Sequence, residues 1–265
     1  MTAIAPIETG PARTIDEVID RLDRIIAKAI RDESRLGFFP ALYRKVTLKV
    51  KEGIETNRFQ DGPRMERLDV NFANRYLEAL RKYQSGEGPS ACWVVSFETA
   101  KSWRPVVLQH LLLGMNAHIN FDLGIAAAAT CPGDELPPLK HDFDEINKIL
   151  AGLVNQVEDE INEVSPWINF LDHIDPSLDD RIINFSMDRA RAQAWKVAVS
   201  FASMPQDEWR APMDELDRKI TLLGAKVADP PNPILSIGLL IIRARESNNV
   251  RHIIEVLNRT STTGV

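Results

Sequence analysis

The feature that most constrains the fold is the apolar segment over residues 106–129, VVLQHLLLGMNAHINFDLGIAAAA, which follows Pro105. A helix of this composition is apolar on almost every side, and such a helix belongs in the interior of a protein. Yet the segment carries two histidines, an aspartate and two asparagines, which are costly to bury without partners. It therefore predicts a central helix whose polar residues are either satisfied core groups or the wall of a site.

The rest of the chain repeats apolar residues at helical spacing. Thr14 and Glu17 fit a capping box at the start of the first predicted helix, and Gly37 fits a stop after it. The best candidate for a strand is CWVVSF (92–97), but a helix is the favoured structure for these residues. The predicted helices span 14–36, 38–59, 65–84, 90–103, 106–129, 141–164, 181–204, 205–228 and 234–259. We expect an all-α, single-domain bundle of about eight to ten helices over residues 13–265, after a disordered lead over residues 1–12.

Composition narrows the class of protein. The net charge of -6 argues against a nucleic-acid partner. Cys92 and Cys131 form no CxxC unit, so we expect small core residues in a reducing compartment. The N-terminus shows no basic segment followed by an apolar one, and the late apolar run 234–242 is too short to cross a bilayer. We expect a cytoplasmic protein without a membrane span that acts on a small-molecule substrate, and a homodimer is left open.

Four positions of the apolar segment are spaced four apart: His110, Gly114, His118 and Asp122. On an α-helix they form one ridge, with His118 and Asp122 adjacent, so that one metal ion could contact both. His110 lies about 12 Å from His118 along the axis. It could hold a second ion, contact a substrate or bond a backbone carbonyl. Gly114 indicates either close helix packing or space for a ligand, because a glycine inside a helix is otherwise costly.

Other polar residues are candidates for the same site. Asp69 lies among apolar residues and is either a partner of Arg67 or Arg75 or a site carboxylate. His141 and Glu145 form a second pair four residues apart, although His141 or Asp142 could instead cap a helix with Glu145 as its capping partner. Surface positions are expected for four further sets of residues: Glu158 and Glu160, His173, Arg189 and Arg191, and His252. Asn116 and Asn120 are expected to tie the apolar helix to its neighbours.

Four stretches together resemble a family of bacterial and fungal proteins of unknown function. They are FFPALYRKVTLKV (38–50), RFQDGPRMERLDVNFANRYL (58–77), LQHLLLGMNAHINFDLGIA (108–126) and HDFDEINKIL (141–150). This resemblance implies an all-helical domain and brings no activity with it. The two His-xxx-acid pairs also resemble, more weakly, those of the zinc-dependent phospholipase C and S1/P1 nuclease hydrolases. That second resemblance implies zinc ligands at His118, Asp122, His141 and Glu145 with Asp69 as a bridging carboxylate, but those enzymes are secreted and use an N-terminal ligand.

Three functions follow from these patterns. The first is a metal-dependent hydrolase of an ester or phosphoester, with His118, Asp122 and Asp69 as ligands and with Asp69 and His110 as catalytic residues. Hydrolysis is favoured over oxygenation, since the Glu-x-x-His pairs of di-iron bundles are absent. The divalent ion is expected to be zinc rather than iron or manganese. The second is a metal-free helical pocket that binds or transforms a small apolar molecule by His/Asp acid–base chemistry. The third is a non-enzymatic helical scaffold.

Overall fold

The computed structural model describes residues 10–167 and 187–260, and every regular element within them is helical. The all-α bundle predicted from the sequence is confirmed, with ten helices in the described residues when the central α5, η2 and α6 are taken as one. The helices are α1 (Ile15–Arg31), α2 (Phe38–Glu55), α3 (Gly62–Ser85), α4 (Ala91–Thr99), α5 (Val107–Met115), the π-helical η2 (Asn116–Leu123), α6 (Gly124–Thr130), α7 (Lys140–Val164), α10 (Met187–Ala202), α11 (Arg210–Ala228), α12 (Pro233–Arg243) and α13 (Val250–Leu257).

Some predictions fall wholly or partly outside the described residues. These are the position of His173, the start of the helix predicted over 181–204, and most of the predicted lead over residues 1–12. The described end of that lead is fixed, because Ala12 is buried and exchanges two backbone hydrogen bonds with the Asn74 side chain. The division into a lead and one domain over 13–265 stays a prediction.

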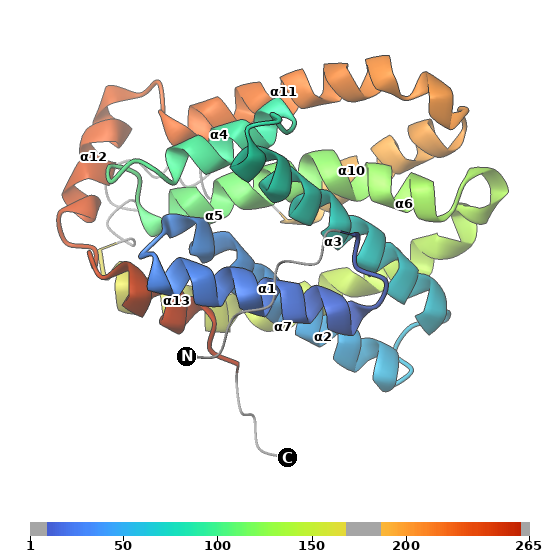
Figure 1. The fold of residues 1–265 in the computed structure, drawn as a ribbon, viewed down its shortest axis with the longest axis horizontal. Coiled ribbons are helices and arrows are strands. Elements are labelled where there is room, and N and C mark those ends of the chain that lie inside the picture. The colour runs from blue at the N-terminus through green and yellow to red at the C-terminus, as the bar shows by residue number, and fades with distance from the viewer. Residues whose placement is uncertain (1–9, 168–186, 261–265) are drawn as a thin grey trace.

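The apolar segment forms the central helix of the bundle. Figure 1 shows α5 and α6 crossing the middle of the molecule, with α4 and α11 on one side and α1 and α2 on the other. Val107–Thr130 is long and apolar enough to cross a membrane, but 94% of its most apolar window is buried inside the protein. Its hydrophobicity is that of a core helix, and the described residues hold no clear membrane span.

The middle of this helix departs from α geometry. Asn116–Leu123 is π-helical, so its backbone hydrogen bonds skip one residue more than in an α-helix. The segment therefore departs from the regular α-helix on which the predicted ridge was drawn, although His118 and Asp122 stay adjacent. Asn116 donates to the Ile220 carbonyl at 3.0 Å, which ties η2 to α11 as predicted, whereas Asn120 donates to Asn116 within η2 at 3.0 Å.

Two glycines of the central helix let neighbours approach. A Cβ on Gly114 would lie 2.5 Å from Cγ of Phe39, and a Cβ on Gly124 would lie 2.5 Å from the Ala194 carbonyl oxygen. Gly114 therefore serves close helix packing, the first of its two expected roles. The neighbour that approaches it is Phe39 of α2.

Several local predictions need correction. Thr14 caps α1, but the Glu17 carboxylate accepts from Arg13 rather than from Thr14. Gly37 is not the stop of α1, which ends at Arg31; it lies in a later turn where Ala29 and Ile254 leave no room for a side chain. At 92–97 the helix predicted over 90–103 is confirmed by α4, and the strand alternative is not formed.

Two buried carboxylates also differ from the prediction. Glu160 is buried rather than exposed, because it forms an ion pair with the buried Lys45 of α2. Asp142 does not cap α7, which begins after Leu139. Its carboxylate accepts from the backbone of Gln60 and Asp61, and thereby fixes the connection between α2 and α3.

Candidate functional site

A cavity of about 480 Å³ opens beside the central helix. Its wall comes from α2, α3, α5, η2, α7 and α10, and most of the side chains that line it are aliphatic or aromatic. Cavities of this size and composition hold small molecules in many proteins. Five of its polar lining residues bear on function: Tyr43, Asp69, His118, Asn147 and Arg191.

His118 reaches the cavity from η2 and is enclosed by aromatic rings. Its imidazole stacks on Phe72 with ring centroids 3.6 Å apart, and the Tyr43 ring meets it edge-on at 4.5 Å. Burial lowers the pKa of His118, and the Asp122 carboxylate offsets this only in part. The imidazole is therefore neutral at physiological pH. Within residues 10–167 and 187–260, neither ring nitrogen has a hydrogen-bond partner.

Asp122 is next to His118, as the sequence predicted, but its carboxylate is already occupied. The His118 Nδ1 to Asp122 Oδ2 distance is 3.6 Å, too long for a hydrogen bond. Oδ1 accepts from Arg75 Nε at 2.8 Å, and Oδ2 accepts from Trp93 Nε1 at 2.8 Å. Asp122 therefore fastens the π-helical segment to α3 and α4.

Asp69 of α3 lines the cavity and is 8% exposed. Its Oδ2 atom has no hydrogen-bond partner, and neither Arg67 nor Arg75 pairs with it in the structure. Burial, with a smaller contribution from the charge of Glu66, raises the pKa of Asp69 to about 7. The carboxyl is thus poised to hold or release a proton near neutral pH, which is the property expected of a general acid or base.

Tyr43 of α2 completes the polar part of the wall. Its hydroxyl is buried and has no hydrogen-bond partner in the described part of the chain. Burial raises the pKa of Tyr43, and the nearby Asp69 raises it further, so the hydroxyl keeps its proton and can donate. Tyr43, Asp69 and His118, here called the polar cluster, present a hydroxyl, a carboxyl and an imidazole to one apolar cavity.

The structure separates the other predicted site residues from this cluster. His110 is buried beside Phe38 and does not line the cavity. Burial, helped by the charges of Arg35 and Arg243, lowers the pKa of His110 to about 3. His110 is therefore a neutral core residue, and its predicted catalytic role gains no support from its position.

His141 and Glu145 also lie away from the cavity lining. The His141 side chain is 57% exposed, and its Nδ1 lies 3.3 Å from Asp142. Glu145 pairs with Arg58 at 2.8 Å and with Lys148 at 2.6 Å. Both carboxylate oxygens of Glu145 are thus engaged by cations.

The predicted metal site is not assembled in the described part of the chain. No three His, Cys, Asp or Glu side chains among those residues lie together at a spacing that suits a metal ion. Only Asp69 and His118 of the predicted ligands share the cavity wall. Binding of a divalent ion stays a prediction.

Two residues of the cavity wall escaped the sequence analysis. Tyr43 belongs to no sequence motif. Its packing surface is nevertheless visible in the sequence of α3, where Asp69, Phe72 and Tyr76 share one helix face at spacings of three and four, and Tyr43 packs on Phe72. Arg191 was expected on the surface but is 5% exposed. Its position inside the apolar stripe of α10, between Ala190 and Ala194, was the available signal.

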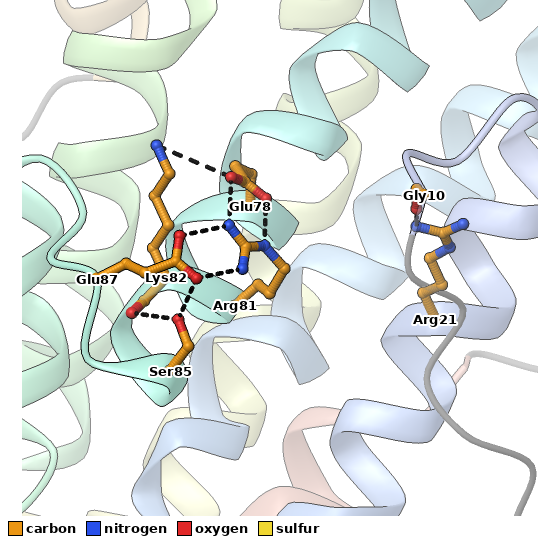
Figure 2. A network of polar contacts seen from close by, with 7 residues as sticks. All are labelled: Gly10, Arg21, Glu78, Arg81, Lys82, Ser85 and Glu87. Carbon is orange, nitrogen blue, oxygen red and sulfur yellow. Dashed lines mark hydrogen bonds and ion pairs between the residues drawn. The ribbon is translucent and has the colours of Figure 1, made fainter.

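A second cavity, of about 520 Å³, lies between α1 and α3 and differs in its electrostatics. Figure 2 shows that Glu78 and Arg81 of its lining belong to a network of polar contacts with Lys82, Ser85 and Glu87. Arg81 pairs with Glu78 and Glu87 at 2.7 Å each, and Arg21 donates to the Gly10 carbonyl. We take the first cavity as the candidate site because it holds the polar cluster, whose buried atoms are unpartnered among the described residues.

Comparison with known proteins gives the chain a family but no activity. No curated protein and no solved structure matches it. The model of a family of unknown function, DUF5995, matches residues 15–230, which include α1 through α11 and every residue of the polar cluster. The chain belongs to this family of unknown function.

Proposed function

We propose that the chain binds a small, largely apolar molecule in the 480 Å³ cavity, with the polar cluster contacting the polar group of that molecule. One observation carries this proposal. Three buried side chains, Tyr43, Asp69 and His118, line the same apolar cavity with polar atoms that have no hydrogen-bond partner among the residues that the structure describes. Such atoms are costly to bury, and a ligand in the cavity would supply the missing partners.

The cluster also offers acid–base chemistry to a bound molecule. Neutral His118 can accept a proton or a hydrogen bond at one ring nitrogen and donate at the other. Asp69 exchanges its proton near neutral pH, while the Tyr43 hydroxyl donates. These three groups can orient a hydroxyl or carbonyl group and move a proton to or from it, which supports a binding protein or an enzyme of proton transfer.

The metal-dependent hydrolase predicted from the sequence is less well supported by the geometry. Its central pair was His118 with Asp122, but both Asp122 oxygens accept hydrogen bonds from Arg75 and Trp93. A metal ion at that pair would have to compete with these donors for the carboxylate oxygens. Asp69 and His118 retain unpartnered atoms, and both can serve the metal-free proposal without such a rearrangement.

Binding of the neutral fluorophore aminoanthracene tests the proposal. We expect saturable binding with enhanced fluorescence to the wild-type chain. Val154 lines the cavity and is 47% exposed, so Val154→Trp should block the cavity with little effect on folding. Leu222→Trp is the matched control, because Leu222 is 66% exposed on α11 and does not line the cavity. Equal binding by both variants, or no binding by the wild type, would show that the cavity is not a ligand site.

A further inference from the structure

Arg191 is a buried cation in the wall of the candidate cavity. It reaches the cavity from α10, and its guanidinium lies over the Phe143 ring of α7 at 4.4 Å from the centroid. Nε donates to the Asn147 side chain, and Nη2 donates to the Phe143 carbonyl. Both of these partners are uncharged oxygen atoms.

No carboxylate among residues 10–167 and 187–260 lies within ion-pairing distance of Arg191. Asp144 and Asp188 are near enough to affect the pKa of Arg191. However, Asp144 already forms an ion pair with Lys140, and Asp188 is exposed to solvent. Burial consequently dominates and lowers the pKa of Arg191 to about 10. A buried cation normally has a counter-ion, because removing a charge from water is costly.

The third guanidinium nitrogen, Nη1, makes no hydrogen bond with the described residues, while the two neutral bonds hold the group in place. Such a fixed guanidinium suits the planar oxygens of a carboxylate or the oxygens of a phosphate. Three carboxyl groups line the same cavity: Glu158 and Asp188 are exposed, and the buried Asp69 keeps its proton up to a pKa of about 7. None of the three forms an ion pair with Arg191 among the described residues, so the apolar wall holds a buried positive charge without a paired anion there.

We infer that the ligand of this cavity is an anionic amphiphile, an apolar body carrying an oxyanion head group that pairs with Arg191. This inference rests on the proposed function and narrows it to a class of ligand. It assigns Arg191 to recognition of the head group. Tyr43, Asp69 and His118 remain free to contact a second polar group of the molecule.

Displacement of aminoanthracene by matched amphiphiles tests the inference. Decanoate and decyl phosphate share an aliphatic chain with decanol, and only decanol lacks the charge. A hydrogen-bonded charge is worth roughly ten- to a hundredfold in affinity, so decanoate or decyl phosphate should displace the probe at concentrations lower than decanol by that factor. The two anions together distinguish a carboxylate site from a phosphate site.

Arg191→Gln should remove this preference while aminoanthracene and decanol still bind. Arg189→Gln is the matched control, because Arg189 is an exposed arginine of the same helix and does not line the cavity. Should Arg191→Gln fail to fold, Arg191→Lys keeps the charge and should keep the preference for the anions.

The outcomes separate the inference from the proposal beneath it. Equal displacement by decanol and both anions in the wild-type chain would overturn the anionic ligand and leave the cavity as a site for neutral molecules. A preference for the anions that persists in Arg191→Gln would also overturn the role of Arg191. Absence of binding by aminoanthracene and all three amphiphiles would instead refute the proposed function.

Discussion

Asp69→Asn is expected to make the protein more stable at neutral and alkaline pH. Burial raises the pKa of Asp69 from 3.8 to about 7, so the folded chain holds this proton more tightly than the unfolded chain. Below pH 3.8, Asp69 is protonated in both the folded and the unfolded chain, and the free energy of unfolding is unaffected. As the pH rises from 3.8 towards about 7, Asp69 ionises in the unfolded chain but not in the folded chain, and the free energy of unfolding falls. At about 1.4 kcal/mol for each pKa unit, the loss reaches about 4 kcal/mol above neutral pH.

Asparagine at this position cannot ionise, so the stability of Asp69→Asn carries none of this dependence. The free energy of unfolding should be measured for both proteins by urea titration, with circular dichroism as the signal, from about pH 5 to pH 8. The difference between the two should change by about 3 kcal/mol over that range, in favour of the variant at higher pH. Any constant cost of burying the amide cancels from this change. Parallel pH profiles would refute the account of Asp69 as a carboxyl held in an apolar wall.

Two further predictions concern the central helix, at Gly114 with Gly152 as its control and at Asp122. Gly114→Ala should lower the free energy of unfolding by about 1 kcal/mol, because the clash with Phe39 outweighs the gain in helix propensity. Gly152→Ala in α7 is the control: its new methyl group meets no neighbour, so it should raise the free energy of unfolding by about 1 kcal/mol. Thermal unfolding of the two variants checks this pair, and stabilisation by both would contradict the close approach of Phe39. Asp122→Asn should lower the free energy of unfolding, measured by urea titration, by about 2 kcal/mol, because it leaves the Arg75 guanidinium without its carboxylate. An unchanged free energy of unfolding would show that this ion pair contributes nothing to stability.

The helices could be predicted from the sequence because the sequence signals that define a helix are local. The amphipathic repeat of α1 and its Thr14 cap depend on neighbours within one or two helical turns, and the structure reproduces both. The failed predictions for buried carboxylates concern contacts between distant segments. The burial of Glu160 depends on Lys45, and the engagement of Asp142 depends on the backbone of the loop at Gln60. Neither partner can be found from spacing along the chain.

The candidate site was predictable only in part, for the same reason. An aspartate and a histidine within apolar stretches identified Asp69 and His118 as residues that need an explanation, and both line the cavity. Tyr43 and Arg191 were missed because a buried hydroxyl without a partner, or a guanidinium without a counter-ion, is a property of three-dimensional packing. The sequence shows which polar groups are present, and the fold decides which of them are left unsatisfied.

The π-helical segment Asn116–Leu123 connects the prediction of the fold with the prediction of the site. An α-helix would let residues 106–129 present one regular ridge, and the prediction of a His118–Asp122 metal pair rested on that regularity. The wider turn at Asn116–Leu123 keeps His118 and Asp122 within 3.6 Å, yet Asp122 is bonded to Arg75 and Trp93. Its carboxylate therefore anchors the irregular turn to α3 and α4, while the His118 ring is held among aromatic rings at the cavity wall. Irregular turns of this kind are frequently found at functional sites. The same backbone feature that departs from the predicted regular helix thus places the His118 ring at the wall of the candidate cavity.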